Sequence, residues 1–264
     1  MIFLLAHDHS LEKVFIVTGS TSGIGRALAG ILYQRNAKVY IAARSETKAH
    51  ATINEIKQEH PDSTGELIYL HLDLNDLTTI KASADEFLSK ESRLDVLWNN
   101  AGVMVPPQGS KSAQGYELQI GTNNLAPFLF TELLHPILKQ TAQTAPKNSI
   151  RVIWVASSAA QYTSRPAIDL SNMDYKRDEG IWSKYIRSKA GNVLHSAEFA
   201  RRTKGEGLIS LVGEFFYPIL ATLLIKDTYC YDKSLNPGNF VTNLQQTTPV
   251  WQRFFFVRFT LVAW

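Results

Sequence analysis

The sequence contains little cysteine and no N-glycosylation signal. Cys230 is its single cysteine, which excludes a disulfide within the chain and fits a reducing compartment. No Asn-x-Ser or Asn-x-Thr acceptor occurs. The opening stretch MIFLLAH is short and has no basic residue before it, so it indicates neither a secretory signal nor a membrane span. We therefore expect a cytoplasmic protein.

An excess of one charge is also lacking. The 27 Lys and Arg residues against 24 Asp and Glu residues leave a net charge of +3, and no basic run is interleaved with aromatic residues, which argues against a nucleic-acid partner. The histidines show no metal-ligand spacing, and no Ser-His-Asp arrangement has support, so neither a metal site nor a hydrolase is expected. With 45% apolar residues and no repeat or linker, residues 1–264 fit one α/β domain.

The most informative stretch is residues 13–26, KVFIVTGSTSGIGR. Its apolar run at residues 14–17 predicts a central strand covered on both faces, and a helical pattern begins at Ile24. The intervening glycines permit a sharp turn and a close approach of the backbone to a bound group; they are Gly19, Gly23 and Gly25. A helix N-terminus after such a turn can bind a phosphate. The alternative is a turn that only packs the helix on the strand.

Further strands are expected, alternating with helices. The strands are residues 38–42, 66–72, 94–98 and 150–156, and the helices are about 46–60, 77–89 and 116–140. The sequence Asn-Asn-Ala-Gly follows the strand at 94–98, and Pro127 predicts a kink near Asn123 in the long helix. A last helix begins with Tyr185 and places Lys189 one turn later on the same face.

These motifs resemble the short-chain dehydrogenase/reductase family in type and in order. The resemblance covers residues 13–209 and returns at 235–238. The motifs that support it are the TGxxxGxG turn, NNAG after a strand, Asn123, Ser158 and the YxxxK pair of Tyr185 and Lys189. The Asp-Leu segment at 169–170 resembles the retinol-dehydrogenase-like branch of that family. A surface Tyr–Lys pair is the alternative for YxxxK alone, but the joint order argues against it.

The resemblance implies a doubly wound, Rossmann-type parallel sheet in a single domain, and it implies the site residues. The expected catalytic residues are Asn123, Ser158, Tyr185 and Lys189. The expected NADP(H) contacts are Gly19, Ser20, Gly23, Ile24, Gly25, Arg44, Asp73, Leu74, Asn100, Tyr185, Lys189, Phe240 and Thr242. Two alternatives stay open: the catalytic serine is Ser157 instead of Ser158, and Asn123 is a buried polar residue without a catalytic role.

The end of the second strand favours NADP(H) over NAD(H). Ala43 stands where NAD-preferring relatives carry an acid for the ribose 2′-hydroxyl, and Arg44 can pair with a 2′-phosphate. A solvated loop cation is the alternative for Arg44. Asp73 matches the family residue that accepts from the adenine amino group, whereas Asn75 or Asp76 is expected to cap the next helix.

The family's chemistry requires these residue types. A free phenol has a pKa of about 10, and the positive charges of Lys189 and of oxidised nicotinamide are expected to lower the pKa of Tyr185. Ser158 would stabilise charge on the substrate oxygen, Lys189 would hold the ribose hydroxyls, and Asn123 would keep a water in a proton relay. The nicotinamide would carry the hydride.

The pattern breaks towards the C-terminal end. A strand that begins at 207–210 should run almost directly into the Pro-Gly turn at 235–238, but the strongly apolar residues 211–233 intervene. We therefore expect an interrupted sixth strand and a short C-terminal end after Thr242. The apolar run at 215–225 is too short to span a bilayer. An unspliced segment, a substrate lid and a membrane-contact element are the alternatives for residues 211–233.

The favoured function is an NADP(H)-dependent oxidoreductase that interconverts a ketone or aldehyde and its alcohol. Its substrate is expected to be a small lipophilic molecule, such as a secondary metabolite or a retinoid-like or steroid-like compound. One alternative is a non-catalytic NADP(H)-binding remnant, truncated or mis-spliced. Another is a protein that contacts a membrane surface through its apolar segments. The substrate, the direction of reaction and the formation of a homo-oligomer are left open.

Overall fold

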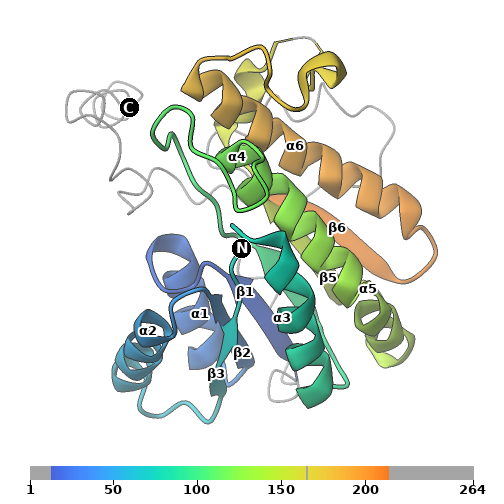
Figure 1. Ribbon diagram of the computed structural model, residues 1–264. Coiled ribbons are helices and arrows are strands. Elements are labelled where there is room, and N and C mark those ends of the chain that lie inside the picture. The colour runs from blue at the N-terminus through green and yellow to red at the C-terminus, as the bar shows by residue number, and fades with distance from the viewer. Residues whose placement is uncertain (1–12, 165, 214–264) are drawn as a thin grey trace, which may run out of the picture.

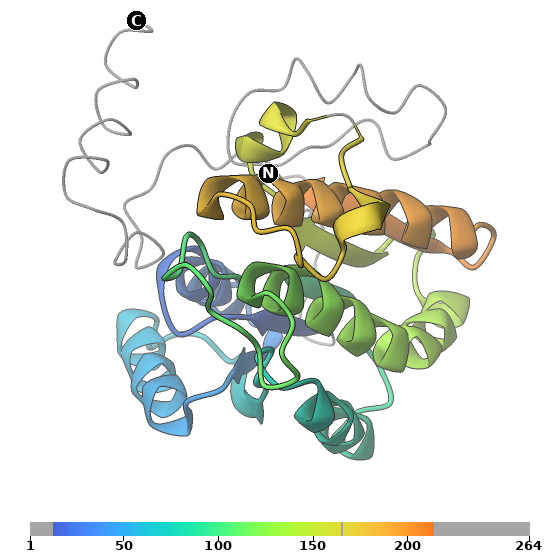
Figure 2. The same ribbon diagram turned by 45° about the horizontal axis from the view of Figure 1, so that its top comes forward.

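The computed structural model describes residues 13–164 and 166–213. These residues form a six-stranded parallel sheet with helices on both faces (Figures 1 and 2). The order of the strands is β3-β2-β1-β4-β5-β6. This arrangement confirms the doubly wound, Rossmann-type fold that was expected from the sequence.

The strands and helices alternate along the chain as expected. The strands are β1 (Val14–Thr18), β2 (Lys38–Ala43), β3 (Glu66–His71), β4 (Val96–Asn99), β5 (Ile150–Val155) and β6 (Leu208–Gly213). The α-helices are α1 (Gly23–Gln34), α2 (Glu46–Glu59), α3 (Leu77–Lys90), α4 (Leu118–Ile120), α5 (Ala126–Thr144) and α6 (Ile181–Arg202). A π-helix, η3 (Gly121–Leu125), joins α4 to α5, and two 3₁₀-helices, η4 (Ser158–Tyr162) and η5 (Leu170–Asn172), precede α6.

One helix start differs from the expectation. The last helix was expected to begin with Tyr185, but α6 begins at Ile181 because Gly180, in an extended conformation, is its N-cap. Tyr185 therefore lies inside the helix, one turn after its start.

The unbroken apolar run of β1 is explained by cores on both faces of the sheet. Val14 and Ile16 pack into a cluster with residues of α3 and α5, whereas Phe15 and Val17 pack into a second cluster with residues of α1 and α2. Successive side chains of a strand point to opposite faces, so a strand covered on both sides must be apolar at every position.

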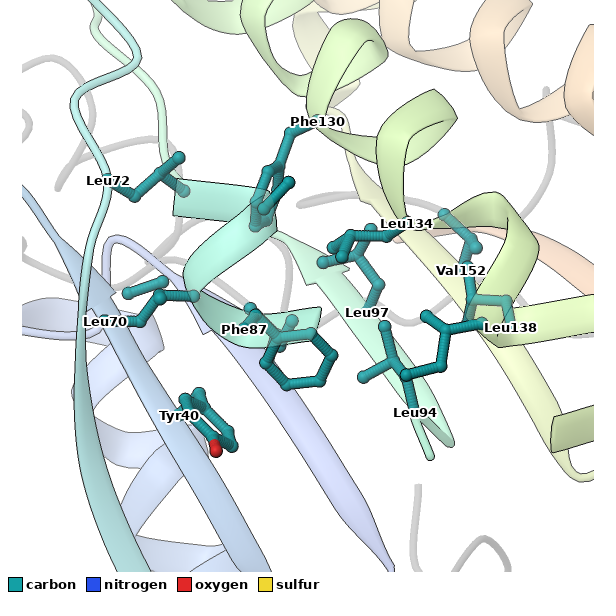
Figure 3. Close-up of a cluster of buried hydrophobic side chains, with 14 of the residues drawn as sticks. Tyr40, Leu70, Leu72, Phe87, Leu94, Leu97, Phe130, Leu134, Leu138 and Val152 are labelled. Atoms are coloured by element: carbon teal, nitrogen blue, oxygen red, sulfur yellow. The ribbon is translucent and has the colours of Figure 1, made fainter. Parts of the chain in front are cut away.

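Figure 3 shows the cluster that is formed with α3 and α5. The ring of Phe87 from α3 meets the ring of Tyr40 from β2 edge to face, with centroids 4.8 Å apart. Phe130 and Leu134 of α5 lie above the middle of the sheet in the same cluster. This packing holds α5 against β4, and so it fixes the helical segment that precedes α5.

The topology creates a crevice between β1 and β4. The chain runs outward from β1 through β2 to β3, and α3 then returns it to the other side of β1, where β4 pairs. The connections after β1 and β4 therefore leave in opposite directions at the carboxyl ends of the strands. In this class of fold, that reversal is where ligands bind.

The sixth strand extends further than the sequence indicated. Residues 211–213, which were assigned to an insert, belong to β6 and pair with β5, as Leu211 does with Ile153 and Gly213 with Val155. The carbonyl of Gly213 also accepts from the Ala156 N–H at 2.7 Å. The strand thus runs at least to residue 213, so the expected interruption does not begin at 211. The remainder of that segment and the C-terminal end lie outside the described residues.

Candidate active site

Two glycines of the turn after β1 are required by close approach. Gly19 has φ +67°, and a Cβ there would lie 2.9 Å from the Cα of Ala101. A Cβ on Gly25 would lie 2.5 Å from the Gly19 carbonyl oxygen. Ser22, the N-cap of α1, makes no side-chain capping bond, so the N–H groups of the first helical turn are left for another acceptor. The turn therefore packs α1 tightly and also fits a phosphate.

Thr18 ties this turn to the loop after β4. Its Oγ1 accepts from the N–H groups of Asn100 at 3.0 Å and Ala101 at 2.9 Å, and the Asn100 side chain donates to the Thr18 carbonyl at 2.8 Å. The two motifs that the sequence placed far apart are thus joined across the crevice. Thr18 was not among the predicted site residues, although it is the threonine of the TGxxxGxG spacing.

The other expected cofactor residues surround the same edge of the sheet. The Ser20 hydroxyl is buried and donates to the Val17 carbonyl, and Leu74 packs into the core. Gly23 and Ile24 begin α1. Phe240 and Thr242 lie outside the described residues.

Arg44 and Asp73 were expected to contact the adenine half of the cofactor, and these two contacts stay predictions. Arg44 is exposed directly after β2, and within the described ranges no ion pair engages it. The Asp73 carboxylate accepts from the Asn75 N–H at 2.9 Å, which fixes the loop after β3. Asp76 is the N-cap of α3 and accepts from the Thr78 N–H, which confirms the expected cap.

Asn123 lies in the π-helix η3 and holds the loop after the NNAG motif. Its Oδ1 accepts from the Val103 N–H at 2.8 Å, and its Nδ2 donates to the Val103 carbonyl and to the Ser188 hydroxyl, each at 2.9 Å. Pro127 follows in the first turn of α5. The disturbance expected near that proline takes the form of a π-turn immediately before it, a feature that is common at functional sites.

Tyr185 and Lys189 lie on one face of α6, as the sequence predicted. Both are buried, and the Lys189 ammonium lies 6.0 Å from the centre of the Tyr185 ring. It donates to the Val155 carbonyl, at the end of β5, at 3.0 Å. A Cβ on Gly102 would lie 3.0 Å from the Asn123 Oδ1 and 3.5 Å from the Lys189 Nζ. The predicted Asn, Tyr and Lys are therefore brought together beside the loop after β4.

Burial dominates the proton affinities of this pair. It raises the pKa of Tyr185, and a hydrogen bond with Ser157 only partly offsets that rise. Burial also lowers the pKa of Lys189 from 10.5 to about 8. The expectation that positive charge lowers the pKa of Tyr185 concerns oxidised nicotinamide as well as Lys189, and it stays a prediction.

The hydroxyl that bonds to the Tyr185 phenol is that of Ser157. Ser157 is also the N-cap of η4 and accepts from the Ala159 N–H at 3.2 Å. Ser158, the predicted catalytic serine, is the first residue of η4 and is half-buried. The structure thus keeps both serines beside α6, and the choice between them stays a prediction.

The described ranges contain no group of three or more His, Cys, Asp or Glu residues that is placed to hold a metal ion. None of their helices has the length and apolar character that crossing a membrane requires.

Comparison with known proteins assigns the family. The sequence model of the short chain dehydrogenase family matches residues 13–167. The chain belongs to the short-chain dehydrogenase/reductase family. Two curated relatives carry that name. The pkfC protein of Emericella nidulans is 57% identical, and the match covers 75% of this chain and 64% of the relative. A Phomopsis amygdali protein is 49% identical, and the match covers 89% of this chain and 64% of the relative. The matched part of this chain thus covers less than two thirds of the length of each relative.

A solved structure of the same fold comes from Mycobacterium paratuberculosis. That uncharacterized protein is 31% identical, with a TM-score of 0.64 over 78% of this chain and 69% of its own. Levodione reductase superposes with a TM-score of 0.66 over 95% of this chain and 82% of its own, at 21% identity. These names do not specify the retinol-dehydrogenase-like branch, which stays a prediction.

Proposed function

We propose that the protein is an NADP(H)-dependent oxidoreductase that interconverts a ketone or aldehyde and its alcohol on a small lipophilic molecule. The observation that carries the proposal is the gathering of Asn123, Tyr185 and Lys189 at the carboxyl ends of β4 and β5, next to the glycine turn. Membership of an oxidoreductase family supports the reaction class. The roles of Tyr185, Lys189, Asn123 and Ser158 as a catalytic set are part of the proposal.

The residues around the glycine turn fit a dinucleotide cofactor. The uncapped first turn of α1 suits a phosphate, and the exposed Arg44, with Ala43 in place of an acid, suits a 2′-phosphate. When bound, nicotinamide supplies the hydride chemistry. Structures of proteins with the same fold contain NADP in one case and NADH in another, so the fold alone does not determine which cofactor is bound. The proposed preference for NADP(H) therefore rests on Arg44.

The side chains have separate tasks in this proposal. The Tyr185 Oη gives its proton to the substrate oxygen in reduction and takes it back in oxidation. The serine hydroxyl donates to the same substrate oxygen. Because burial brings the pKa of Lys189 to about 8, its ammonium and amine are both accessible near neutral pH, which suits a group that passes protons to the phenol. Asn123 fixes the loop that borders these groups.

Turnover on a carbonyl panel tests the proposal. The full-length protein is mixed with NADPH and a series of lipophilic ketones and aldehydes, and NADPH consumption is followed by absorbance. Consumption that depends on the carbonyl compound is expected. Tight NADPH binding without turnover on any member of the panel would instead favour the non-catalytic alternative.

Cofactor preference is tested at Arg44. NADPH should bind more tightly than NADH, and Arg44→Ala should narrow this preference by about 1.5–3 kcal/mol, the contribution of a charge-assisted hydrogen bond. Lys48→Ala is the matched control, because it removes an exposed positive charge from the first turn of α2. Equal affinity of the unmodified protein for the two cofactors would contradict the NADP(H) assignment.

A further inference from the structure

The Val155 carbonyl, at the end of β5, accepts hydrogen bonds from two buried side chains. The Lys189 Nζ lies 3.0 Å from this oxygen, and the Asn192 Nδ2 lies 2.9 Å from it. Asn192 is one turn after Lys189 on α6 and is only 4% exposed. A carbonyl oxygen has two acceptor positions, so these two donors fill it.

Asn124 fixes the orientation of the Asn192 amide. The Asn124 Nδ2 donates at 2.8 Å to the Asn192 Oδ1 and at 2.8 Å to the Ser188 carbonyl. Because the oxygen of Asn192 is used in this way, its nitrogen must face Val155. Within the described residues the buried Asn124 Oδ1 has no partner, so the amide is held through its nitrogen alone.

The backbone of α6 is shaped to admit this contact. A Cβ on Gly191 would lie 2.6 Å from the Asn124 Nδ2, so only glycine leaves room for the amide. Asn124 also lies in η3, directly after Asn123. Its side chain donates to the Ser188 carbonyl, and the Asn123 side chain donates to the Ser188 hydroxyl. The π-helix therefore presents two consecutive amides to the face of α6 that carries Lys189.

We propose that Asn192 and Asn124 are positioning residues for Lys189. An ammonium has three N–H donors, and Val155 uses one of them. Asn192 holds the Val155 carbonyl in place and fills its second acceptor position. The ammonium is then fixed at a single point and presents its remaining donors to the cofactor ribose. This inference rests on the proposed function, since it assumes that Lys189 binds the cofactor.

Packing between α6 and β5 is the competing explanation for these buried amides. A packing role would lower stability and would affect cofactor binding to the same extent whatever residue stands at 189. A positioning role requires the effect to pass through the Lys189 ammonium. The two explanations therefore differ in the coupling between Asn192 and Lys189, which a double-mutant cycle measures.

The test is NADPH affinity of the full-length protein, measured by fluorescence titration. Asn192→Leu removes the donor at similar volume and should weaken NADPH binding about tenfold, the effect of losing roughly one buried hydrogen bond. In a Lys189→Met background the same change should have almost no effect. Thr141→Val is the matched control, since it removes a buried hydroxyl that serves the Leu94 N–H and the Ile137 carbonyl. Its effect on affinity should be small in both backgrounds.

Each outcome bears on the inference. If Asn192→Leu lowers NADPH affinity equally in the unmodified protein and in the Lys189→Met background, the inference is overturned, while the proposed function is unaffected. If the unmodified protein binds neither NADPH nor NADH, the proposed function and this inference both fail. Thermal melting checks that the variants fold, and Asn124→Leu, which is expected to show the same coupling, replaces Asn192→Leu if that variant does not.

Discussion

Lys189 differs from an ordinary surface lysine in its burial and in its pKa. Its amine is buried, and desolvation alone lowers its pKa from 10.5 to about 8. Between these two values the folded state binds fewer protons than the unfolded state, so the free energy of unfolding must rise with pH across this window. Burying the ammonium thus costs stability at neutral pH, as is common for functional sites.

Lys189→Met should remove this pH dependence. The free energy of unfolding of the unmodified protein should increase by up to ~3 kcal/mol more than that of the variant between about pH 8 and pH 10.5, with the gain largest at the alkaline end. At pH 7 the variant should be the more stable of the two. Urea unfolding at a series of pH values measures both. Parallel pH profiles for the two proteins would mean that Lys189 is not a desolvated ammonium.

The two serines after β5 make different predictions. The hydrogen bond from Ser157 favours the Tyr185 phenolate, so Ser157→Ala should raise the pKa of Tyr185 and move the pH dependence of turnover to higher pH. Ser158→Ala should lower turnover and leave its pH dependence in place, because its expected contact is with the substrate. If Ser157→Ala abolishes turnover and Ser158→Ala has no effect, the catalytic serine is Ser157.

For individual residues, the sequence indicated features that lie within a local motif, but it did not indicate contacts between residues far apart in the chain. Tyr185, Lys189 and Asn123 were predicted because a helix period or a short pattern identifies each. The pairing of Asn124 with Asn192 joins residues far apart in the sequence, and no local pattern indicates it. The rise in the pKa of Tyr185 was missed for a similar reason, since it depends on how completely the phenol is buried.

The turn between β1 and α1 leaves little room for a larger residue at Gly25. A Cβ on Gly25 would meet the Gly19 carbonyl at 2.5 Å and the Asn100 Nδ2 at 2.6 Å, and the first of these is backbone that cannot turn aside. The turn and the NNAG loop therefore depend on this position together.

Gly25→Ala should destabilise the protein by about 1–3 kcal/mol, the usual range for overpacking, and should weaken NADPH binding. Gly30→Ala is the control in the same helix. Its Cβ would have only His60 Nε2 nearby, at 3.8 Å, so it should be neutral or stabilise by about 0.5–1 kcal/mol. Thermal unfolding and cofactor titration compare the two. Similar behaviour of both variants would contradict the account of the turn.

The order and type of the main elements could be predicted, but some of their details could not. The apolar pattern indicated a long helix across residues 116–140, whereas the chain forms α4, η3 and α5 there. A π-turn adds one residue to a helical turn, a change too small to appear in the hydrophobic period. The end of β6 was missed because residues 211–213 are followed by further apolar residues, which hide the boundary of the strand.

For the whole molecule, residues 13–213 supply the sheet, the crevice and the catalytic candidates. Residues 211–213 belong to the sheet, so the hypothesis of an unspliced segment, which would not be part of a working enzyme, now concerns residues 214–233. Peptides covering residues 214–226 from active, soluble protein would overturn that proposal. The chain covers 64% of the length of two curated relatives, so its activity as a whole has to be measured.

Turnover by Tyr185→Phe tests the central claim most directly. The substitution removes only the phenolic oxygen, which is expected to transfer the proton. The Tyr185 side chain is buried, and the Lys189 ammonium lies 6.0 Å from the centre of its ring. NADPH-dependent turnover should fall by about 100-fold or more, while NADPH affinity, measured on the same preparation, should stay within about twofold. A variant that keeps most of the turnover of the unmodified protein would show that Tyr185 is not the acid–base group.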